Sequence, residues 1–300
     1  MNRIAVIRIL AGGVAALLLA VPADPLLARQ ARERVLYVNA FERDARTPMT
    51  GLTVRDFVVR EDGIAREVLR VTPATSPMAI ALLVDNTQAA SGAITDIRNG
   101  VTALVKVTEG LGPTALIGYG DRPTILTDYT TTAKTLLSGV GRIFAMPGSG
   151  ATLLDAIRET SQGLAKREED RAAIVVIATE HPEFSNLHYT QVLETLRKSG
   201  AQLHVVVLST TNTDMTSEEG RNRATVLDRG PRESGGIRWD VLATSAFESQ
   251  LGNLGRVLKS QYRVIYARPE SLIPPERVEV SAAKPGIEAR GAPARGQAVR

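Results

Sequence analysis

From residue 78 onward, the chain alternates short apolar runs with longer segments whose apolar residues recur at helical spacing. Residues 79–84 form a continuous apolar run, which is typical of a strand buried on both faces. Residues 93–108 follow, with Ile94, Ile97 and Val101 on one helical face. The alternation continues to residue 259. It predicts an α/β fold with an open, doubly wound, mainly parallel, Rossmann-like sheet that helices cover on both faces.

The segments on either side of this α/β domain, residues 78–259, have the pattern of β structure. Residues 34–72 contain strand-like runs separated by a Glu-Asp-Gly turn at residues 61–63, a strong hairpin signal. Strand character returns after residue 261. We therefore expect residues 34–72 and 261–290 to form one small β module.

Two stretches are expected to lack regular structure. Residues 210–234 are polar and rich in Gly, Arg and Glu, which predicts a mobile surface excursion. Residues 291–300 are rich in Gly, Ala, Pro and Arg, which predicts a disordered tail.

The N-terminus has the pattern of a secretory signal peptide over residues 1–23. Arg3 and Arg8 supply the positive charge, residues 9–21 are apolar, and small residues suitable for cleavage follow. The apolar run is shorter than the ~20 residues of a membrane-spanning helix. An uncleaved N-terminal anchor is the alternative. We expect a periplasmic or secreted protein with no integral membrane span after cleavage of the leader.

The composition narrows the classes of chemistry. The chain has 300 residues and a formal net charge of +4, to which the predicted leader contributes Arg3 and Arg8. Because the charges are mixed along the sequence with no basic block, we expect no nucleic-acid partner. The chain has no cysteine, which excludes disulfides and thiolate catalysis.

Oxygen-bearing side chains gather where strands are predicted to end. The apolar run 79–84 stops at Asp85, and Thr87 follows. Thr152 lies in a Gly-rich loop before a helix, and Thr179-Glu180 follows the predicted strand 174–178. Ligands of open α/β sheets bind at the carboxyl edge, so these groups are candidates for a shared site.

The order of these segments resembles the von Willebrand factor type A domain and its metal-ion-dependent adhesion site. The flanks resemble an exported bacterial group, the VWFA-related Acidobacterial domain. The segments that carry the resemblance are Asp85-x-Thr87, residues 116–121, residues 150–157, residues 175–180, and, in the flanks, residues 51–63 and 261–266.

This resemblance implies a Mg²⁺ site made by Asp85, Thr87, Thr152 and Glu180. Ala89 stands where the family has a second hydroxyl, and Glu180 stands where it has Asp. Two alternatives stay open. Either Mg²⁺ binds and bridges to a partner's carboxylate, or the site has lost its metal and kept the scaffold. If carboxylates cluster without a cation they repel, so Asp85→Ala is expected to cost little stability.

The histidines are weaker candidates. His181 and His188 are expected near the site edge, facing water or a partner, and His204 is expected to be a hydrogen-bonded structural residue. No Ser-His-Asp pattern is present in strand–elbow context. The resemblance implies an exported, non-catalytic, adhesion-type domain that binds a protein partner through a degenerate metal site. The alternative is a metal-independent scaffold that binds through residues 210–234 or the β module, and a metal-dependent hydrolase ranks third.

Overall fold

The computed structural model describes residues 31–179, 181–209, 215–269 and 273–297, and a six-stranded sheet lies at its centre. The strand order is β10-β9-β8-β5-β6-β7, with β7 antiparallel to β6 and the other neighbours parallel. The predicted open, mainly parallel sheet is confirmed. The strands are β5 (Met78–Val84), β6 (Thr114–Gly118), β7 (Thr124–Thr130), β8 (Arg171–Ala178), β9 (Gln202–Leu208) and β10 (Arg238–Val241).

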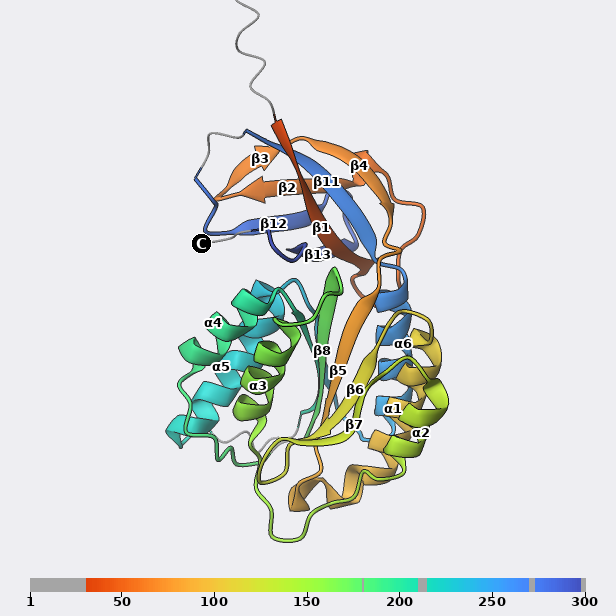
Figure 1. Ribbon diagram of the computed structural model, residues 1–300, viewed down its shortest axis with the longest axis vertical. Helices are drawn as coiled ribbons and strands as arrows, with labels where there is room; N and C mark the ends of the chain where they lie inside the picture. The colour runs from red at the N-terminus through yellow and green to blue at the C-terminus, as the bar shows by residue number, and fades with distance from the viewer. Residues whose placement is uncertain (1–30, 180, 210–214, 270–272, 298–300) are drawn as a thin grey trace, which may run out of the picture. The chain divides into compact units, whose positions relative to one another are not determined.

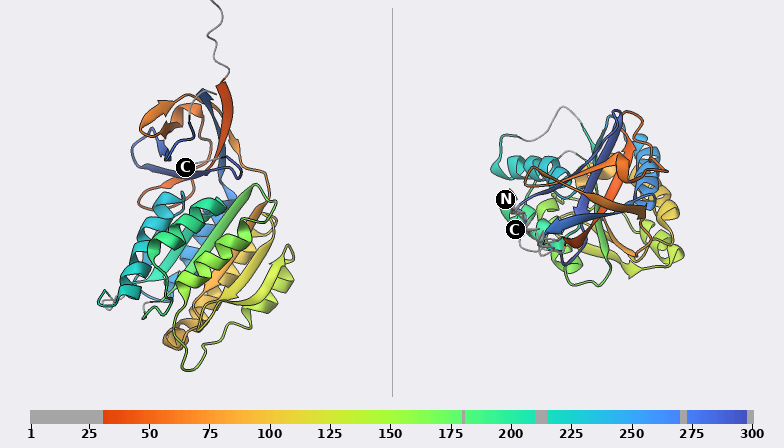
Figure 2. Two further views of the ribbon diagram at one scale, coloured as in Figure 1. Left: turned by 60° about the vertical axis from the view of Figure 1, so that its left-hand side comes forward. Right: turned by 90° about the horizontal axis from the view of Figure 1, so that it is seen from above.

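Helices cover both faces of this sheet, as Figures 1 and 2 show. Alternate side chains of β5 face opposite layers: Ile80 and Leu82 join the core formed with α1, α2 and α6, whereas Leu83 joins the core formed with α3, α4 and α5. This two-sided burial explains the continuous apolar runs of the strands. The helices are α1 (Ile94–Thr108), α2 (Ala133–Val140), α3 (Leu153–Leu164), α4 (Tyr189–Ser199), α5 (Glu218–Glu233) and α6 (Ala246–Lys259).

Helix α5 occupies most of the segment that was expected to be a mobile excursion, so that expectation is wrong for residues 218–233. Ser217 caps the helix by accepting a hydrogen bond from the Gly220 N–H at 3.0 Å. Only a narrow stripe of the helix is apolar, with Val226 and Leu227 buried in the core of α3 and α4. Two apolar residues in a charged segment gave little periodic signal.

Strands from both ends of the described chain form the β module. One sheet has the order β13-β1-β11-β4 and a second has the order β12-β2-β3. The strands pair antiparallel throughout, and the short helix η2 (Val54–Asp56) precedes β2. Their bounds are β1 (Ala31–Glu42), β2 (Phe57–Glu61), β3 (Ile64–Arg66), β4 (Val68–Pro73), β11 (Tyr262–Pro269), β12 (Val278–Ala282) and β13 (Ile287–Pro293).

The C-terminal tail begins later than expected. Strand β13 continues to Pro293, and Gly291 pairs with Val38 of β1, so residues 291–293 are a strand rather than the start of a disordered tail. Main-chain hydrogen bonds form this pairing, and they do not require large side chains. Gly291 fits because a Cβ there would lie 2.8 Å from the Tyr37 carbonyl oxygen.

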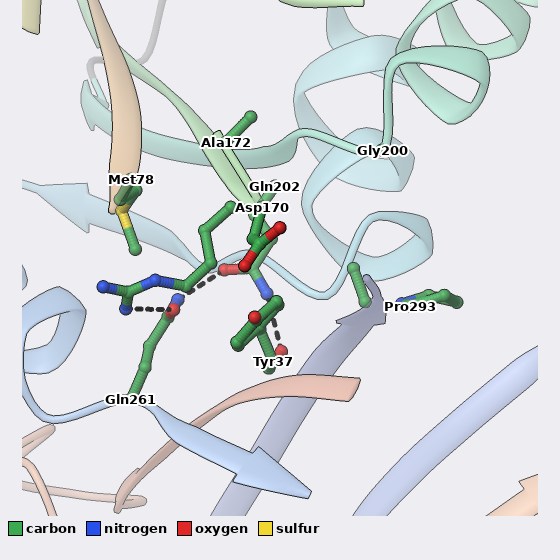
Figure 3. Close-up of a pocket in the computed structure, with 10 residues that line it drawn as sticks. Tyr37, Met78, Asp170, Ala172, Gly200, Gln202, Gln261 and Pro293 are labelled. Carbon is green, nitrogen blue, oxygen red and sulfur yellow. Dashed lines mark hydrogen bonds between the residues drawn. The ribbon is translucent and has the colours of Figure 1, made fainter. Parts of the chain in front are cut away.

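A buried amide cluster joins the β module to the central sheet (Figure 3). Gln202 of β9 accepts hydrogen bonds from Asn39 Nδ2 at 3.0 Å and from Gln261 Nε2 at 2.7 Å. It also donates to the Tyr37 carbonyl at 2.9 Å, and Arg171 donates to Gln261 at 3.2 Å. The adjoining cavity of about 10 Å³ is close to the smallest that holds one water molecule.

The path of the chain places β5 and β8 side by side at a switch point. From β5 the chain proceeds through β6 and β7 to one edge of the sheet, and from β8 it proceeds through β9 and β10 to the other. The loops that follow β5 and β8 therefore leave the sheet in opposite directions, and such a switch point is where open α/β sheets bind ligands. Asp85 and Thr179 lie at this point.

The predicted leader, residues 1–23, lies outside the described residues. Within the described part of the chain, no helix combines the length and apolar character needed to cross a membrane.

Candidate functional site

The carboxylate of Asp85 is the centre of the site at the switch point. Asp85 directly follows β5 and is completely buried. Its Oδ1 atom accepts hydrogen bonds from the Thr87 N–H at 3.0 Å and from the Thr87 hydroxyl at 2.8 Å. The chain then enters the short helix η3 (Gln88–Ala93), so this local turn fixes the first loop.

The other carboxylate oxygen of Asp85 is bound by the loop that follows β8. Its Oδ2 atom accepts hydrogen bonds from the Thr179 N–H at 3.0 Å, from the Thr179 hydroxyl at 2.6 Å and from His181 Nε2 at 2.7 Å. Burial alone would raise the pKa of Asp85, but the bonds from His181 and the two threonines outweigh it. They hold the pKa of Asp85 well below the usual range of an aspartate.

His181 is buried, so the expectation that it faces water or a partner is wrong. Its Nε2 atom contacts the Asp85 carboxylate, and its Nδ1 atom lies 3.2 Å from the Pro182 carbonyl oxygen. His181 thus donates through Nε2 to the carboxylate, and the site contains a buried Asp–His pair.

Of the two remaining predicted ligands, Thr152 belongs to the described residues. Thr152 lies beside the end of β6, where its N–H and its hydroxyl both donate to the Tyr119 carbonyl at 3.0 Å. Glu180 lies outside the described residues. Ala89 is exposed and supplies no ligand atom. Across the described part of the chain, no group of three or more His, Cys, Asp or Glu side chains is arranged to hold a metal.

The described side chains do not match the ligand set of a hard divalent cation. Mg²⁺ requires near-octahedral oxygen ligands with open lone pairs. The Asp85 carboxylate already accepts from five protein donors, and one of these is the ring of His181. A cation beside Asp85 would have to displace that ring.

A buried ion pair secures the same loop. Glu183 accepts hydrogen bonds at 3.3 Å from the N–H groups of Leu154, at the start of α3, and Ser185. Arg223 of α5 lies 3.7 Å from the Glu183 carboxylate and donates to the Thr179 carbonyl at 2.7 Å. Burial raises the pKa of Glu183. The loop after β8 is thus fixed to α3 and α5.

Several residues that form this site were not singled out from the sequence. Glu183 and Arg223 were missed, His181 was assigned to the surface, and Thr179 was noted beside Glu180 but not included in the predicted ligand set. The usable signal was the burial of Asp85 itself, because a carboxylate at the end of a fully apolar strand needs a cation or several donors. His181 lies just after the neighbouring strand β8 and is one of three histidines in the chain.

The fold is that of the von Willebrand factor type A domain. A structure described as von Willebrand factor type A from Catenulispora acidiphila superimposes with a TM-score of 0.50 at 10% identity, covering 84% of this chain and 74% of that one. Proximal thread matrix protein 1 from the mussel byssus, with a zinc-occupied MIDAS motif, superimposes with a TM-score of 0.51 at 10% identity. That match covers 70% of this chain and 50% of the mussel protein.

The chain therefore has the fold of a von Willebrand factor type A domain. No protein-family model matches the sequence, and comparison with curated protein sequences gives no match.

Proposed function

We propose that this chain is an exported, non-catalytic protein-interaction domain that binds its partner at the carboxyl edge of the sheet without a cation. The fold supports this proposal by bringing the loops after β5 and β8 together at the switch point, where open α/β sheets bind ligands. The resemblance to adhesion-type domains supports the class of activity. The likeness of the flanks to an exported bacterial group and the leader pattern of residues 1–23 support export.

The observation that carries the cation-free form of the proposal is the enclosure of Asp85. An open metal site needs a carboxylate oxygen that faces the cation. Here both oxygens accept hydrogen bonds from Thr87, Thr179 and His181, and Asp85 is completely buried, so neither oxygen faces an open position. Of the two alternatives left by the sequence, we therefore favour the scaffold without metal.

The hydrogen bonds of the edge also support a non-catalytic role. The ring of His181 is held inside the protein between the Asp85 carboxylate and the Pro182 carbonyl, so it is not presented to a substrate as a general base would be. The Ser149 hydroxyl donates to the Met146 carbonyl at 2.7 Å and accepts from the Gln88 N–H at 3.1 Å. These bonds hold loops together and present no activated nucleophile.

Binding through residues 210–234 is less favoured by the structure. Within that segment, α5 packs on α4 and contributes Arg223 to the site. Its buried stripe stabilises the domain, so less of the segment is free for a partner than the sequence suggested.

Cation titration of the folded protein tests the proposal. We expect no calorimetric heat and no change in melting temperature with Mg²⁺, Mn²⁺ or EDTA, and no gain in Ala89→Ser. His181→Ala combined with Ala89→Ser removes the His181 ring from Asp85 and adds a hydroxyl, so that protein should bind Mn²⁺. His188→Asn, at an exposed histidine, is the matched control.

Saturable Mg²⁺ binding by the wild-type protein, tightened in Ala89→Ser, would establish the cation-dependent alternative instead. The stability expected of Asp85→Ala also changes. Removing the carboxylate leaves the buried His181 ring and four other donors without their acceptor, so the loss should be about 3–5 kcal/mol rather than small. Urea denaturation without added metal measures it.

A further inference from the structure

Three large apolar side chains are exposed on the loops around the switch point. Phe144 and Phe184 are 61% and 65% exposed, and Met146 is 36% exposed. Phe144 and Met146 belong to the segment between α2 and α3, and Phe184 belongs to the loop after β8. Single exposed apolar residues are ordinary, but a group at the ligand-binding edge of an α/β sheet indicates an interaction site.

Hydrogen bonds between the loops bring these side chains into one region. The Met146 N–H donates to the Asn86 carbonyl at 2.9 Å, which joins the α2–α3 segment to the loop after β5. The Phe184 N–H donates to the Ala151 carbonyl at 2.8 Å, and the Phe184 ring lies so close to Gly150 that a Cβ there would clash with it. The short segment from Met146 to Gly150 therefore connects the loop that carries Phe144 and Met146 with the position that the Phe184 ring contacts.

The same bonds hold the apolar side chains outward. A loop fixed by main-chain bonds at both neighbouring loops cannot fold its aromatic rings into the core without breaking those bonds. Binding to a surface that is already ordered loses less conformational entropy than binding to a free loop. The exposed rings are therefore preorganised for a partner.

Three arginines lie on the loops that carry the apolar group or contact them. The Arg98 guanidinium lies 4.5 Å from the centre of the Phe144 ring, and its Nε atom donates to the Ile143 carbonyl at 2.8 Å. Arg142 is exposed and donates to the Thr127 hydroxyl at 3.1 Å. Arg122 is exposed beside Asp121, whose N–H donates to the Gly150 carbonyl at 2.7 Å.

Carboxylates of the described residues do not neutralise these arginines. Among the ion pairs of the described chain, none involves Arg98, Arg122 or Arg142. Asp85 and Glu183 are buried among their own partners. Asp121 is exposed in this region, and its Oδ1 atom accepts a hydrogen bond from the Gly150 N–H at 3.0 Å. One exposed carboxylate thus stands against three arginines, so the region is both apolar and basic.

We propose that this apolar–basic surface binds a protein segment that carries aromatic or aliphatic side chains next to Asp or Glu. The surface consists of Phe144, Met146 and Phe184 with Arg98, Arg122 and Arg142. Partner apolar groups cover the exposed rings, and partner carboxylates meet the guanidinium groups, which bind carboxylates in bidentate geometry. This inference rests on the proposed function, because it names the partner chemistry of the same edge.

The composition of the loops favours a protein partner over an anionic membrane. Phe, Met and Arg are enriched in protein interfaces, whereas Lys is depleted there. Residues 85–93, 119–123, 141–152 and 181–188 contain no lysine. Binding to anionic lipid is therefore treated as an outcome that opposes the proposal.

The proposed partner chemistry is tested by selecting binders from a library of short random peptides and measuring their affinity by fluorescence anisotropy after labelling. We expect the selected peptides to be rich in Asp or Glu beside Phe, Trp or Leu. Their binding should weaken at least about tenfold in Phe184→Ser and in the charge-reversed Arg122→Glu/Arg142→Glu protein. High salt should weaken binding too, because ion pairs contribute.

Matched variants on the β module control for general effects. Ile64→Ser replaces an apolar side chain that is 61% exposed, and Arg60→Glu reverses an exposed charge on β2. Both variants should bind the selected peptides as the wild type does. Melting curves check that every variant is folded.

Three results would overturn the inference: no acidic residues in the selected peptides, equal binding of the peptides by the wild type and the surface variants, or binding only to phosphatidylglycerol vesicles. Selected peptides that bind regardless of Phe184 and the arginines would assign the interaction to other residues of the edge and leave the proposed function standing. Cation-dependent binding of those peptides would instead contradict the proposed function itself.

Discussion

Acid should destabilise this domain through one histidine in the core. His204 lies in β9, is completely buried, and neither of its ring nitrogens has a hydrogen-bond partner among the described residues. The sequence analysis expected a hydrogen-bonded histidine, so the absence of partners for this ring is a correction. Burial, with a smaller contribution from the charge of Arg290, lowers the pKa of His204 to about 3.

The direction and size of the effect follow from the two pKa values. In the unfolded chain, His204 has its ordinary pKa of about 6.5. Above that pH the ring is neutral in both states and the stability is complete. As the pH falls below about 6.5, the unfolded chain takes up a proton that the folded protein excludes. The free energy of unfolding then falls by about 1.4 kcal/mol per pH unit until the pH approaches the folded pKa.

Urea denaturation at pH 7 and at about pH 4.5 measures this loss. The two-unit interval below pH 6.5 corresponds to about 2.7 kcal/mol from His204 alone. His204→Leu should lose about that much less than the wild type over the same interval. At pH 7 it should be at least as stable, because leucine has no buried nitrogen that lacks a partner.

The difference between the two proteins isolates His204, because every other titrating group is common to both. His188→Asn, which changes an exposed histidine, should follow the wild type at both pH values. If His204→Leu and the wild type lose equal stability on acidification, His204 is not excluded from protonation in the folded state, and the reasoning is refuted.

Two further predictions concern packing and the amide cluster. Gly139→Ala should destabilise the domain by about 1–3 kcal/mol, because the new methyl group would clash with the Thr127 hydroxyl. Gly163→Ala has open space around the new methyl group and should stabilise α3 by about 0.5–1 kcal/mol. Equal changes in the free energy of unfolding of the two variants, measured by urea denaturation, would contradict both expectations. Gln202→Leu leaves the Tyr37 carbonyl and the Asn39 and Gln261 amides short of partners, and should cost about 3 kcal/mol or more. A melting temperature equal to that of the wild type would show that the cluster contributes no stability.

The sequence determined the parts of this protein that depend on local pattern. Continuous apolar runs such as residues 79–84 identified the central strands, because a strand buried on both faces tolerates few polar residues. Helical spacing identified α1, and the alternation of the two patterns gave the doubly wound sheet. The position of Asp85 at a strand end located the candidate site.

Tertiary structure decided what depends on meetings between distant segments. Helix α5 shows only a narrow apolar stripe, and β13 is formed by main-chain pairing with β1, so neither has a strong local signal. Asp85 and His181 are separated by 96 positions, and only the neighbouring placement of β5 and β8 brings them to 2.7 Å. The sequence shows which side chains are ionisable. Whether a buried carboxylate is satisfied by a cation or by hydrogen-bond donors of the protein depends on which side chains the folded loops bring to it.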